Sequence, residues 1–432
     1  MSNFQIIILV VFGVFLIIGV LMFSGFIPGL RSPDIEGLTG QVTIWGTLPR
    51  TPVQDLLDEV TQKHRAISIV YVEKSATTFD KDIIEAIASG VGPDLIMLPE
   101  ELIYRYADKV LPISFETLPE RTYRDTFIEE GELYLSSQGA LGLPLSVDPL
   151  ILYWNRDMLS GAGISAPPKT WEELLTMVPA LVVKDSSGNI KKAGIAFGEV
   201  RNITHAKDVL ALLFIGAGNP ITSKEEGILR SVLDESLGMS LRPGEEALRF
   251  YTEFSNPVKG TYSWNKSLPA SRDMFITGDL ALYIGYASEL FGIRERNPHL
   301  NFDVAGVPQT GGEGTKGTLG HILALSVVRN SDNAIGAYGV ASLMSGEDFS
   351  FKLAQSIALP PVRRDLLSKR PSDAYQNVFY QSALISKSWV DPSPEATNLI
   401  FKTAVENVVS GKERPGDAIR TASRELSKLL TR

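Results

Sequence analysis

The sequence predicts an α/β protein in which one N-terminal transmembrane helix precedes a large water-exposed body. Residues 6–26 form a nearly unbroken apolar run, and the first charged side chain of the chain is Arg31. Strand-like and helix-like segments then alternate between residues 41 and 98. Such alternation predicts an open, mainly parallel sheet with helices on both faces, and such sheets bind ligands at the carboxyl ends of their strands.

The apolar run is long enough to cross a membrane, because a bilayer core of about 30 Å requires roughly 20 apolar helical residues. The alternative is a cleaved signal peptide, which has a basic start and an apolar core of about 7 to 15 residues. Residues 1–5 contain no Lys or Arg, and Met22 and Phe23 fit poorly beside a small-residue cleavage site. We therefore expect residues 1–30 to be an uncleaved anchor and residues 31–40 to be a linker. The flanking charges hardly define its orientation.

Composition favours an exported body of two lobes. Of the 432 residues, roughly 400 remain after the anchor, which is too many for one small core. The absence of cysteine fits an extracytoplasmic protein without disulfides and excludes a lipid-modified N-terminal cysteine as the tether. A net charge of -9, with no basic stripe, argues against nucleic acid as a partner.

The body begins with strand, helix, strand, helix and strand. Residues 41–46 alternate as a strand, residues 53–60 have helical apolar spacing, and residues 67–72 are again strand-like. A second helix over residues 79–88 ends at Gly90 and leads into a strand over residues 95–98. The sequence thus places three parallel strand ends side by side.

These strand ends carry Trp45, Thr47, Ser75 and Glu100, which supply an aromatic ring, hydroxyls and a carboxylate. Each has a structural alternative: Trp45 can be a core residue, and Ser75 and Glu100 can cap the helices that follow them. Because the three ends converge, we expect a ligand site in the crevice between them.

Other motifs are interpreted as scaffold. Thr170 and Glu173 have the spacing of a capping box, and the preceding prolines block helix before it, so we expect a helix to start there with Trp171 in a structural role. Residues 144–155 have the pattern of a strand that crosses between lobes. The glycine-rich residues 310–317 lack the Gly-Lys-Ser/Thr ending of a phosphate-binding loop.

Several blocks of the body resemble the extracellular solute-binding proteins of ABC importers, in the maltose-binding-protein-like (family 1, sugar-binding) group. The blocks occur in the family's order at residues 42–46, 86–95, 142–155, 162–174, 275–282 and 307–309. The resemblance implies a two-lobed, periplasmic-binding-protein type II-like fold with a ligand cleft and a hinge. It further implies a lobe one of residues 41–150 plus 302–345 and a lobe two of residues 151–301 plus 346–432, with crossings at residues 148–155 and 301–304.

A sugar site requires flat apolar surfaces for the ring faces and polar partners for the hydroxyls. The candidates are Trp45, Thr47, Ser75, Glu100 and His321 on lobe one, Asp148 on the crossing strand, Tyr153, Trp264, Tyr283 and Tyr286 on lobe two, and Arg363 on a later loop. The resemblance places Tyr286 where the family commonly carries a stacking aromatic, and Arg363 on a loop that reaches the cleft. The alternative for each aromatic is core packing, and for Arg363 a surface salt bridge.

Enzymatic activity is not expected. The four histidines are scattered, no His-Glu-x-x-His motif occurs and no cysteine is available as a nucleophile. Hydrolysis by a carboxylate pair, Glu100 and Asp148, stays open on the residues alone, whereas the family uses such carboxylates to accept hydrogen bonds from hydroxyls. We expect neither a metal nor another cofactor.

The resemblance implies a membrane-anchored, single-pass receptor with its body outside the cell. It would be a monomer that captures a carbohydrate or similar small polar solute and delivers it to the permease subunits of an ABC importer. The alternative is a membrane-tethered sensor with no transport role. Against a sensor, an apolar helical pattern at Leu426, Leu429 and Leu430 closes the chain with no signalling module after it.

Overall fold

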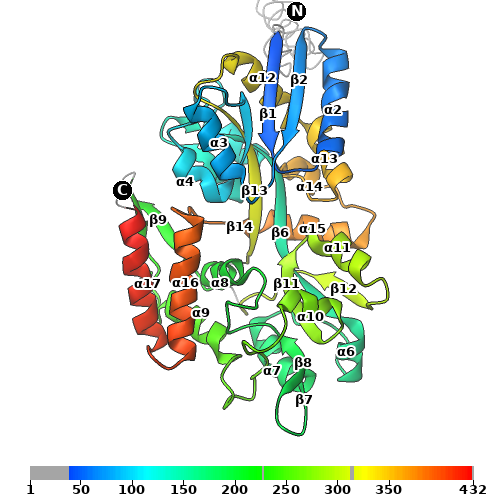
Figure 1. Cartoon of the computed structure of the whole chain (residues 1–432), viewed down its shortest axis with the longest axis vertical. Helices are drawn as coiled ribbons and strands as arrows, with labels where there is room; N and C mark the ends of the chain where they lie inside the picture. The colour runs from blue at the N-terminus through cyan, green and yellow to red at the C-terminus, as the bar shows by residue number, and fades with distance from the viewer. Residues whose placement is uncertain (1–37, 226–227, 312–315, 431–432) are drawn as a thin grey trace, which may run out of the picture.

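Two lobes, joined by two strands of one continuous sheet, make up the described part of the protein (Figure 1). This computed structural model describes residues 38–225, 228–311 and 316–430. The main sheet has the order β2-β1-β3-β13-β6-β11-β8-β7, with β12 paired to β6 and β14 paired to β13. The α/β, two-lobed expectation is confirmed.

Lobe one is built on three parallel strands, as the alternating pattern predicts. In β1 and β2 buried residues alternate with partly or fully exposed ones, whereas β3 is an almost wholly buried apolar run between its neighbours. Its elements are β1 (Gly40–Gly46), α2 (Arg50–Lys63), β2 (Ile67–Glu73), α3 (Phe79–Ala88), β3 (Leu95–Pro99), η1 (Glu100–Leu102), α4 (Ile103–Tyr106), α5 (Glu120–Thr126), η2 (Glu129–Tyr134), β4 (Leu135–Ser136), β5 (Gly139–Ala140), α12 (Ala334–Met344) and α13 (Glu347–Ile357).

Lobe two surrounds the other end of the sheet with helices. Its elements are α6 (Arg156–Gly161), α7 (Trp171–Leu181), β7 (Val183–Lys184), β8 (Ile190–Ile195), α8 (Ala206–Gly216), β9 (Thr222–Glu225), β10 (Ile228–Ser231), α9 (Pro243–Glu253), α10 (Ser271–Ile276), β11 (Leu280–Tyr286), α11 (Glu289–Arg296), β12 (Phe302–Ala305), α16 (Pro394–Val409) and α17 (Pro415–Leu430). Helices α16 and α17 form the red and orange pair beside the rest of this lobe (Figure 1).

The lobes are joined by β6 (Leu143–Asn155) and β13 (Thr318–Val327), which are antiparallel neighbours. Leu143 to Val147 of β6 contribute to the lobe-one core, and Leu150 to Tyr153 contribute to the lobe-two core. In β13, Leu319 lies in the lobe-two core and Ile322 in the lobe-one core. Both strands therefore cross where Asp148 pairs with His321. The segments α14 (Arg364–Leu367), α15 (Ala374–Leu384) and β14 (Ser386–Lys387) follow α13 along the chain.

Two of the expected lobe boundaries differ from those in the structure. Residues 301–304 were expected as the second crossing, but residues 302–304 belong to β12, which pairs with the lobe-two end of β6. Phe302 and Val304 pack in the lobe-two core. The second crossing is β13. Residues from 346 onward were expected in lobe two, but Phe349 and Leu353 of α13 pack in the lobe-one core, because the amphipathic α13 lies against α2.

The capping box at the start of α7 is confirmed, with one difference. Thr170 Oγ1 accepts a hydrogen bond from the Glu173 amide at 3.2 Å, as the motif requires. The Glu173 carboxylate accepts from the Lys169 amide at 2.6 Å rather than from the Thr170 amide. Trp171 packs edge-on against Phe250 at 5.6 Å between ring centroids, in agreement with a structural role.

The expected anchor, residues 1–30, and most of the expected linker lie outside the described residues. Among the helices of residues 38–225, 228–311 and 316–430, none is both long and apolar enough to cross a membrane.

Candidate functional site

A cavity of about 1080 Å³ lies between the lobes, beside the two crossing strands. Its lining comes from both lobes and from the crossings, and consists of Thr47, Leu48, Pro49, Pro52, Ala76, Thr77, Phe79, Asp80, Pro99, Glu101, Leu102, Ser146, Asp148, Ser288, Phe291, His321, Leu323, Gln355, Ser356, Ile357, Ala358, Leu359, Pro394 and Glu395. A cleft of this size holds a small ligand of several rings.

The carboxyl ends of the three parallel strands open into this cavity. Thr47 follows β1, Thr77 follows β2 and Glu101 follows β3, and all three line the cleft. The strands are parallel and adjacent in the order β2-β1-β3, so their ends must lie at the same edge of the sheet. The convergence expected from the sequence therefore exists.

The crossing strands contribute Asp148 and His321, which face the same cavity from opposite positions of the ladder. The Ser288 amide of lobe two donates to Asp148 Oδ1 at 3.0 Å. Burial raises the pKa of Asp148 to about 6, although the hydrogen bond from Ser288 opposes that rise. Asp148 thus connects the crossing to the start of α11.

His321 is held by Glu100, which is buried behind it. His321 Nδ1 donates to Glu100 Oε1 at 2.5 Å, and the Ile322 amide donates to Glu100 Oε2 at 3.0 Å. Burial alone would lower the pKa of His321, but the Glu100 carboxylate and the Asp208 carboxylate raise that pKa to about 10. The imidazole is therefore a cation at neutral pH whose charge is matched by a buried partner.

A chain of polar side chains continues from His321 into lobe two. His321 Nε2 lies 3.9 Å from Asp208 Oδ2, and His205 Nδ1 lies 3.8 Å from that same oxygen. His205 Nε2 donates to Glu289 Oε1 at 2.9 Å. The Tyr286 ring stacks on His321, with the ring centroids 4.4 Å apart and the planes at 25°. These contacts fix the crossing strand against α8 and α11.

The four aromatic residues expected on lobe two are all buried. Trp264 has 0% of its surface exposed, and its Nε1 donates to Asn202 Oδ1 at 3.1 Å. Tyr153 donates to the Tyr286 carbonyl at 2.7 Å, and Tyr283 donates to Glu289 Oε2 at 2.9 Å. Tyr153, Tyr283 and Tyr286 belong to the lobe-two core, and none of the four lines the cavity.

The remaining candidates lie at or beyond the rim. Glu100 is buried beneath the cavity wall. Lys74 Nζ lies 3.7 Å from the centroid of the Trp45 ring, which is not among the lining residues. Ser75 shares a 2.8 Å hydrogen bond with the lining residue Thr77. Arg363 pairs with Asp365 at 2.8 Å and lines a different cavity, of about 680 Å³, in lobe one. The surface salt bridge weighed for Arg363 is thus present.

The candidates therefore divide into two sets. The structure brings Thr47, Asp148 and His321 together in the lining, with Glu100 behind them. It does not bring Trp45, Ser75, Tyr153, Trp264, Tyr283, Tyr286 and Arg363 into that lining.

Phe291 and Glu101 are two of the lining residues that the sequence reasoning did not propose as candidates. The Phe291 ring is 58% exposed although it is a large apolar group. Its position could have been found, because Leu290 and Ile293 share the core face of α11 at helical spacing and leave Phe291 off that face. Glu101 directly follows the candidate Glu100, and the pattern could not tell which carboxylate faces outward.

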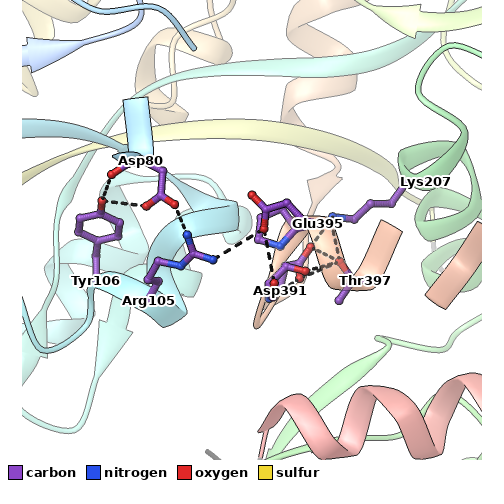
Figure 2. A network of polar contacts seen from close by, with 9 residues as sticks. Asp80, Arg105, Tyr106, Lys207, Asp391, Glu395 and Thr397 are labelled. Atoms are coloured by element: carbon purple, nitrogen blue, oxygen red, sulfur yellow. Dashed lines mark hydrogen bonds and ion pairs between the residues drawn. The ribbon is translucent and has the colours of Figure 1, made fainter. Parts of the chain in front are cut away.

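A second set of inter-lobe contacts lies at the edge of the cleft (Figure 2). Arg105 of α4 pairs with Asp80 of α3, and its Nη2 lies 3.7 Å from Glu395 Oε2 of α16. Tyr106 Oη donates to Asp80 Oδ1 at 2.9 Å. Within lobe two, Lys207 pairs with Asp391, which also accepts from Thr397. Arg105 therefore connects a lobe-one helix to a lobe-two helix beside the cavity.

The described residues contain no group of three or more His, Asp or Glu side chains arranged to hold a metal ion. The polar groups of the site are carboxylates, hydroxyls, one amide and one imidazolium, which suit hydrogen bonding, and the exposed Phe291 ring suits stacking. Apolar side chains such as Leu48, Leu102 and Leu323 complete the lining.

The family is shown by a match to the model of the bacterial extracellular solute-binding protein family over residues 55–378. The chain belongs to this family, whose members are binding proteins. The matched range includes both crossings and all of the lining except a few residues at either end.

Individual relatives are distant in sequence. A candidate binding protein of Brucella abortus (strain 2308) is 22% identical over 362 residues, which is 80% of this chain and 81% of the relative. Among solved structures, a cyclic alpha-maltosyl-1,6-maltose binding protein from Arthrobacter globiformis is 16% identical with a TM-score of 0.73, covering 91% of this chain and 99% of that one. A cyclo/maltodextrin-binding protein complexed with maltotetraose is 15% identical with the same TM-score, covering 91% and 98%. These structures share the two-lobed fold.

Proposed function

We propose that this protein is an extracytoplasmic receptor that binds a carbohydrate between its lobes and delivers it to an ABC import permease. The observation that carries the proposal is the inter-lobe cavity, where three strand ends, both crossings and lobe two contribute polar groups around one exposed ring. Solved structures of the same fold hold maltotetraose and alpha-D-tagatose, which supports a sugar as the class of ligand.

We propose that Phe291, rather than Tyr286, stacks on the sugar ring. An exposed phenyl ring at the cleft surface offers a flat apolar face to the C–H groups of a sugar ring. Thr47, Thr77, Ser146 and Asp148 supply hydroxyl and carboxylate partners around it. The carboxylates would accept hydrogen bonds from ligand hydroxyls, so we infer binding without catalysis.

Membrane attachment through residues 1–30, with the body outside the cell and the protein a monomer, completes the proposal. Protein extracted from membranes should keep its N-terminal sequence, and protease added to intact spheroplasts should digest the body. Protection of the body from protease would contradict delivery from outside the cell. A sensor without a transport role is distinguished by genetics: permease subunits encoded next to this chain favour transport.

Ligand binding is tested by thermal unfolding of the full chain with a panel of carbohydrates. A ligand at 100 times its dissociation constant adds roughly 2.7 kcal/mol to stability, which raises the melting temperature measurably. No shift with any carbohydrate, together with a shift by an unrelated solute, would refute a sugar as the ligand.

The stacking role of Phe291 is tested with Phe291→Ala. Loss of the ring should weaken ligand binding by roughly 0.5 to 1.5 kcal/mol or more and leave stability nearly unchanged, because the ring is exposed in the free protein. Phe351→Ala is a matched control, since Phe351 is also an exposed phenylalanine on a helix but does not line the cleft. Calorimetric titration of both variants gives the comparison, and equal affinities would refute the stacking role.

A further inference from the structure

The charges of the cleft are strongly one-sided. Among the described residues that line it, four are carboxylates, namely Asp80, Glu101, Asp148 and Glu395, and none is Lys or Arg. The one cationic group in the lining is His321. Its charge is already engaged by Glu100 at 2.5 Å and lies 3.9 Å from Asp208. The imidazolium therefore offsets the four lining carboxylates only in part.

The four lining carboxylates have different partners. Asp80 and Glu395 are joined through Arg105, so these two share one positive charge at the edge of the cleft (Figure 2). Asp148 is held by two neutral donors of Ser288, the amide and the hydroxyl, and it makes no ion pair among the described residues. The Glu101 carboxylate makes neither a hydrogen bond nor an ion pair within the described part of the chain.

Glu101 and Asp148 are also partly removed from water. Burial and the neighbouring Glu100 carboxylate raise the pKa of Glu101, although His321 and Lys207 oppose that rise. Burial raises the pKa of Asp148, although Ser288 and His321 oppose that rise. Removing a carboxylate from water is costly unless a cation or hydrogen-bond donors replace the lost hydration. Two incompletely compensated carboxylates in one ligand cavity are therefore best stabilised by a positive charge that arrives with the ligand.

We propose that the cleft selects a polyhydroxylated ligand that carries a protonated amine, such as an amino sugar, and rejects sugar acids and phosphorylated sugars. The inference rests on the proposed function, because it specifies the charge of the solute that the same cleft binds. Glu101 and Asp148 are the specificity-determining residues, because an ammonium group in the cavity would donate charge-assisted hydrogen bonds to either carboxylate. An anionic ligand would meet like charges with no lysine or arginine in the lining to pair with it.

The test uses the full chain in detergent micelles and sugars of several backbones, each in a neutral, an amino and a uronic acid form. Isothermal titration at neutral pH measures the dissociation constant of every form. For the backbone that fits, the amino form should bind at least about tenfold more tightly than the neutral form, which is about 1.4 kcal/mol. The uronic acid form should bind more weakly than the neutral form.

Different results would contradict the charge selectivity and the receptor function. A neutral or uronic acid form that binds as tightly as its amino counterpart would overturn the charge selectivity and leave the carbohydrate receptor intact. Absence of binding by all forms of all backbones would contradict the receptor function itself.

Variants of the two carboxylates test whether these residues determine the preference for an amino sugar. Glu101→Gln combined with Asp148→Asn keeps the shapes of the side chains and removes both charges, so the amino-to-neutral preference should fall toward onefold. Glu347→Gln is the control, because Glu347 pairs with Lys369 on lobe one and does not line the cleft. Its preference should equal that of the wild-type chain. An unchanged preference in the double variant, with its fold confirmed by circular dichroism, would refute the assignment to these two residues.

Discussion

The Glu130 carboxyl couples the stability of lobe one to pH. It is 2% exposed, and its Oε2 accepts a 2.5 Å hydrogen bond from Ser386 Oγ, whereas Oε1 has no partner among the described residues. Burial and the nearby Glu100 carboxylate raise its pKa to about 8, and His321 opposes that rise. At neutral pH the group is therefore protonated in the folded chain and ionised in the unfolded chain.

The free energy of unfolding should consequently fall as pH rises from about 4.5 to 8, because the folded state then binds one proton more than the unfolded state. The slope from this one group approaches about 1.4 kcal/mol per pH unit. Glu130→Gln should remove that slope and stabilise the protein at pH 8. Urea unfolding at several pH values measures it. Glu129→Gln, an exposed neighbour paired with Lys387, should retain the slope, and a retained slope in Glu130→Gln would refute the assignment.

Whether a single aromatic residue faces the cleft or the core could not be predicted from the sequence. Trp264 and Tyr286 were candidates for the cleft because their residue types suit stacking, and both turned out to be buried in the lobe-two core. Burial depends on which face of a strand or loop packs inward, and no local pattern around Trp264 specifies that. Thr47, Asp148 and His321 do line the cavity, because a strand end or a crossing brings the backbone to the cleft. Trp45 and Ser75 show that such a position does not by itself fix the direction of the side chain.

Truncation of Trp264 tests whether this ring belongs to the lobe-two core. Trp264→Ala should destabilise the fold by about 3 to 5 kcal/mol, since it removes a fully buried ring and leaves the Asn202 amide oxygen without its donor. Thermal and urea unfolding measure the loss. A loss below about 1 kcal/mol would contradict its place in the core.

At the scale of elements, the parallel strands and helices of lobe one were predictable, and the crossings only in part. The alternation of apolar and polar residues predicts β1 and β2, and β6 is long enough to be recognised as a crossing. The four-residue β12 could not be distinguished from a crossing, because a short apolar-polar pattern does not reveal which strand it pairs with. Assigning α13 to lobe one likewise requires its tertiary contact with α2.

The start of α7 provides a test at this scale. Thr170→Ala removes the side-chain acceptor for the Glu173 amide and should cost about 1 kcal/mol of stability. Thr176→Ala is the internal control, because the Thr176 hydroxyl donates to a carbonyl within the same helix and caps nothing. Chemical unfolding compares the two, and equal effects would show that the cap contributes nothing specific.

We expect the two lobes to open and close about β6 and β13, because they are otherwise connected by the segment that follows α13 and by side-chain contacts. The Arg105–Glu395 pair and the hydrogen bond from Tyr104 Oη to the Leu430 carbonyl, at 3.3 Å, both cross between the lobes. A ligand that contacts both lobes would favour the closed arrangement through its differential affinity.

Removing the Arg105 side chain should shift the ligand-free protein toward open arrangements. An exposed ion pair contributes at most about 1 kcal/mol, so the closed population should fall by a factor of up to roughly five. Small-angle scattering should report a larger radius of gyration for Arg105→Ala without ligand, and a smaller one for wild type with ligand. Arg124→Ala, whose partners Glu120 and Glu132 lie within lobe one, is the control. Identical curves for all three proteins would exclude closure about the crossings.

The interleaved path of the chain has a consequence for biosynthesis. The lobe-one core includes residues from Leu38 to Ala383, and the lobe-two core includes residues from Leu150 to Leu430. During translation, at roughly 5 to 20 residues per second, neither core can be completed until most of the chain has been made. The nascent chain therefore stays incompletely folded for tens of seconds, a window in which a secretion machinery that threads unfolded polypeptide could engage it.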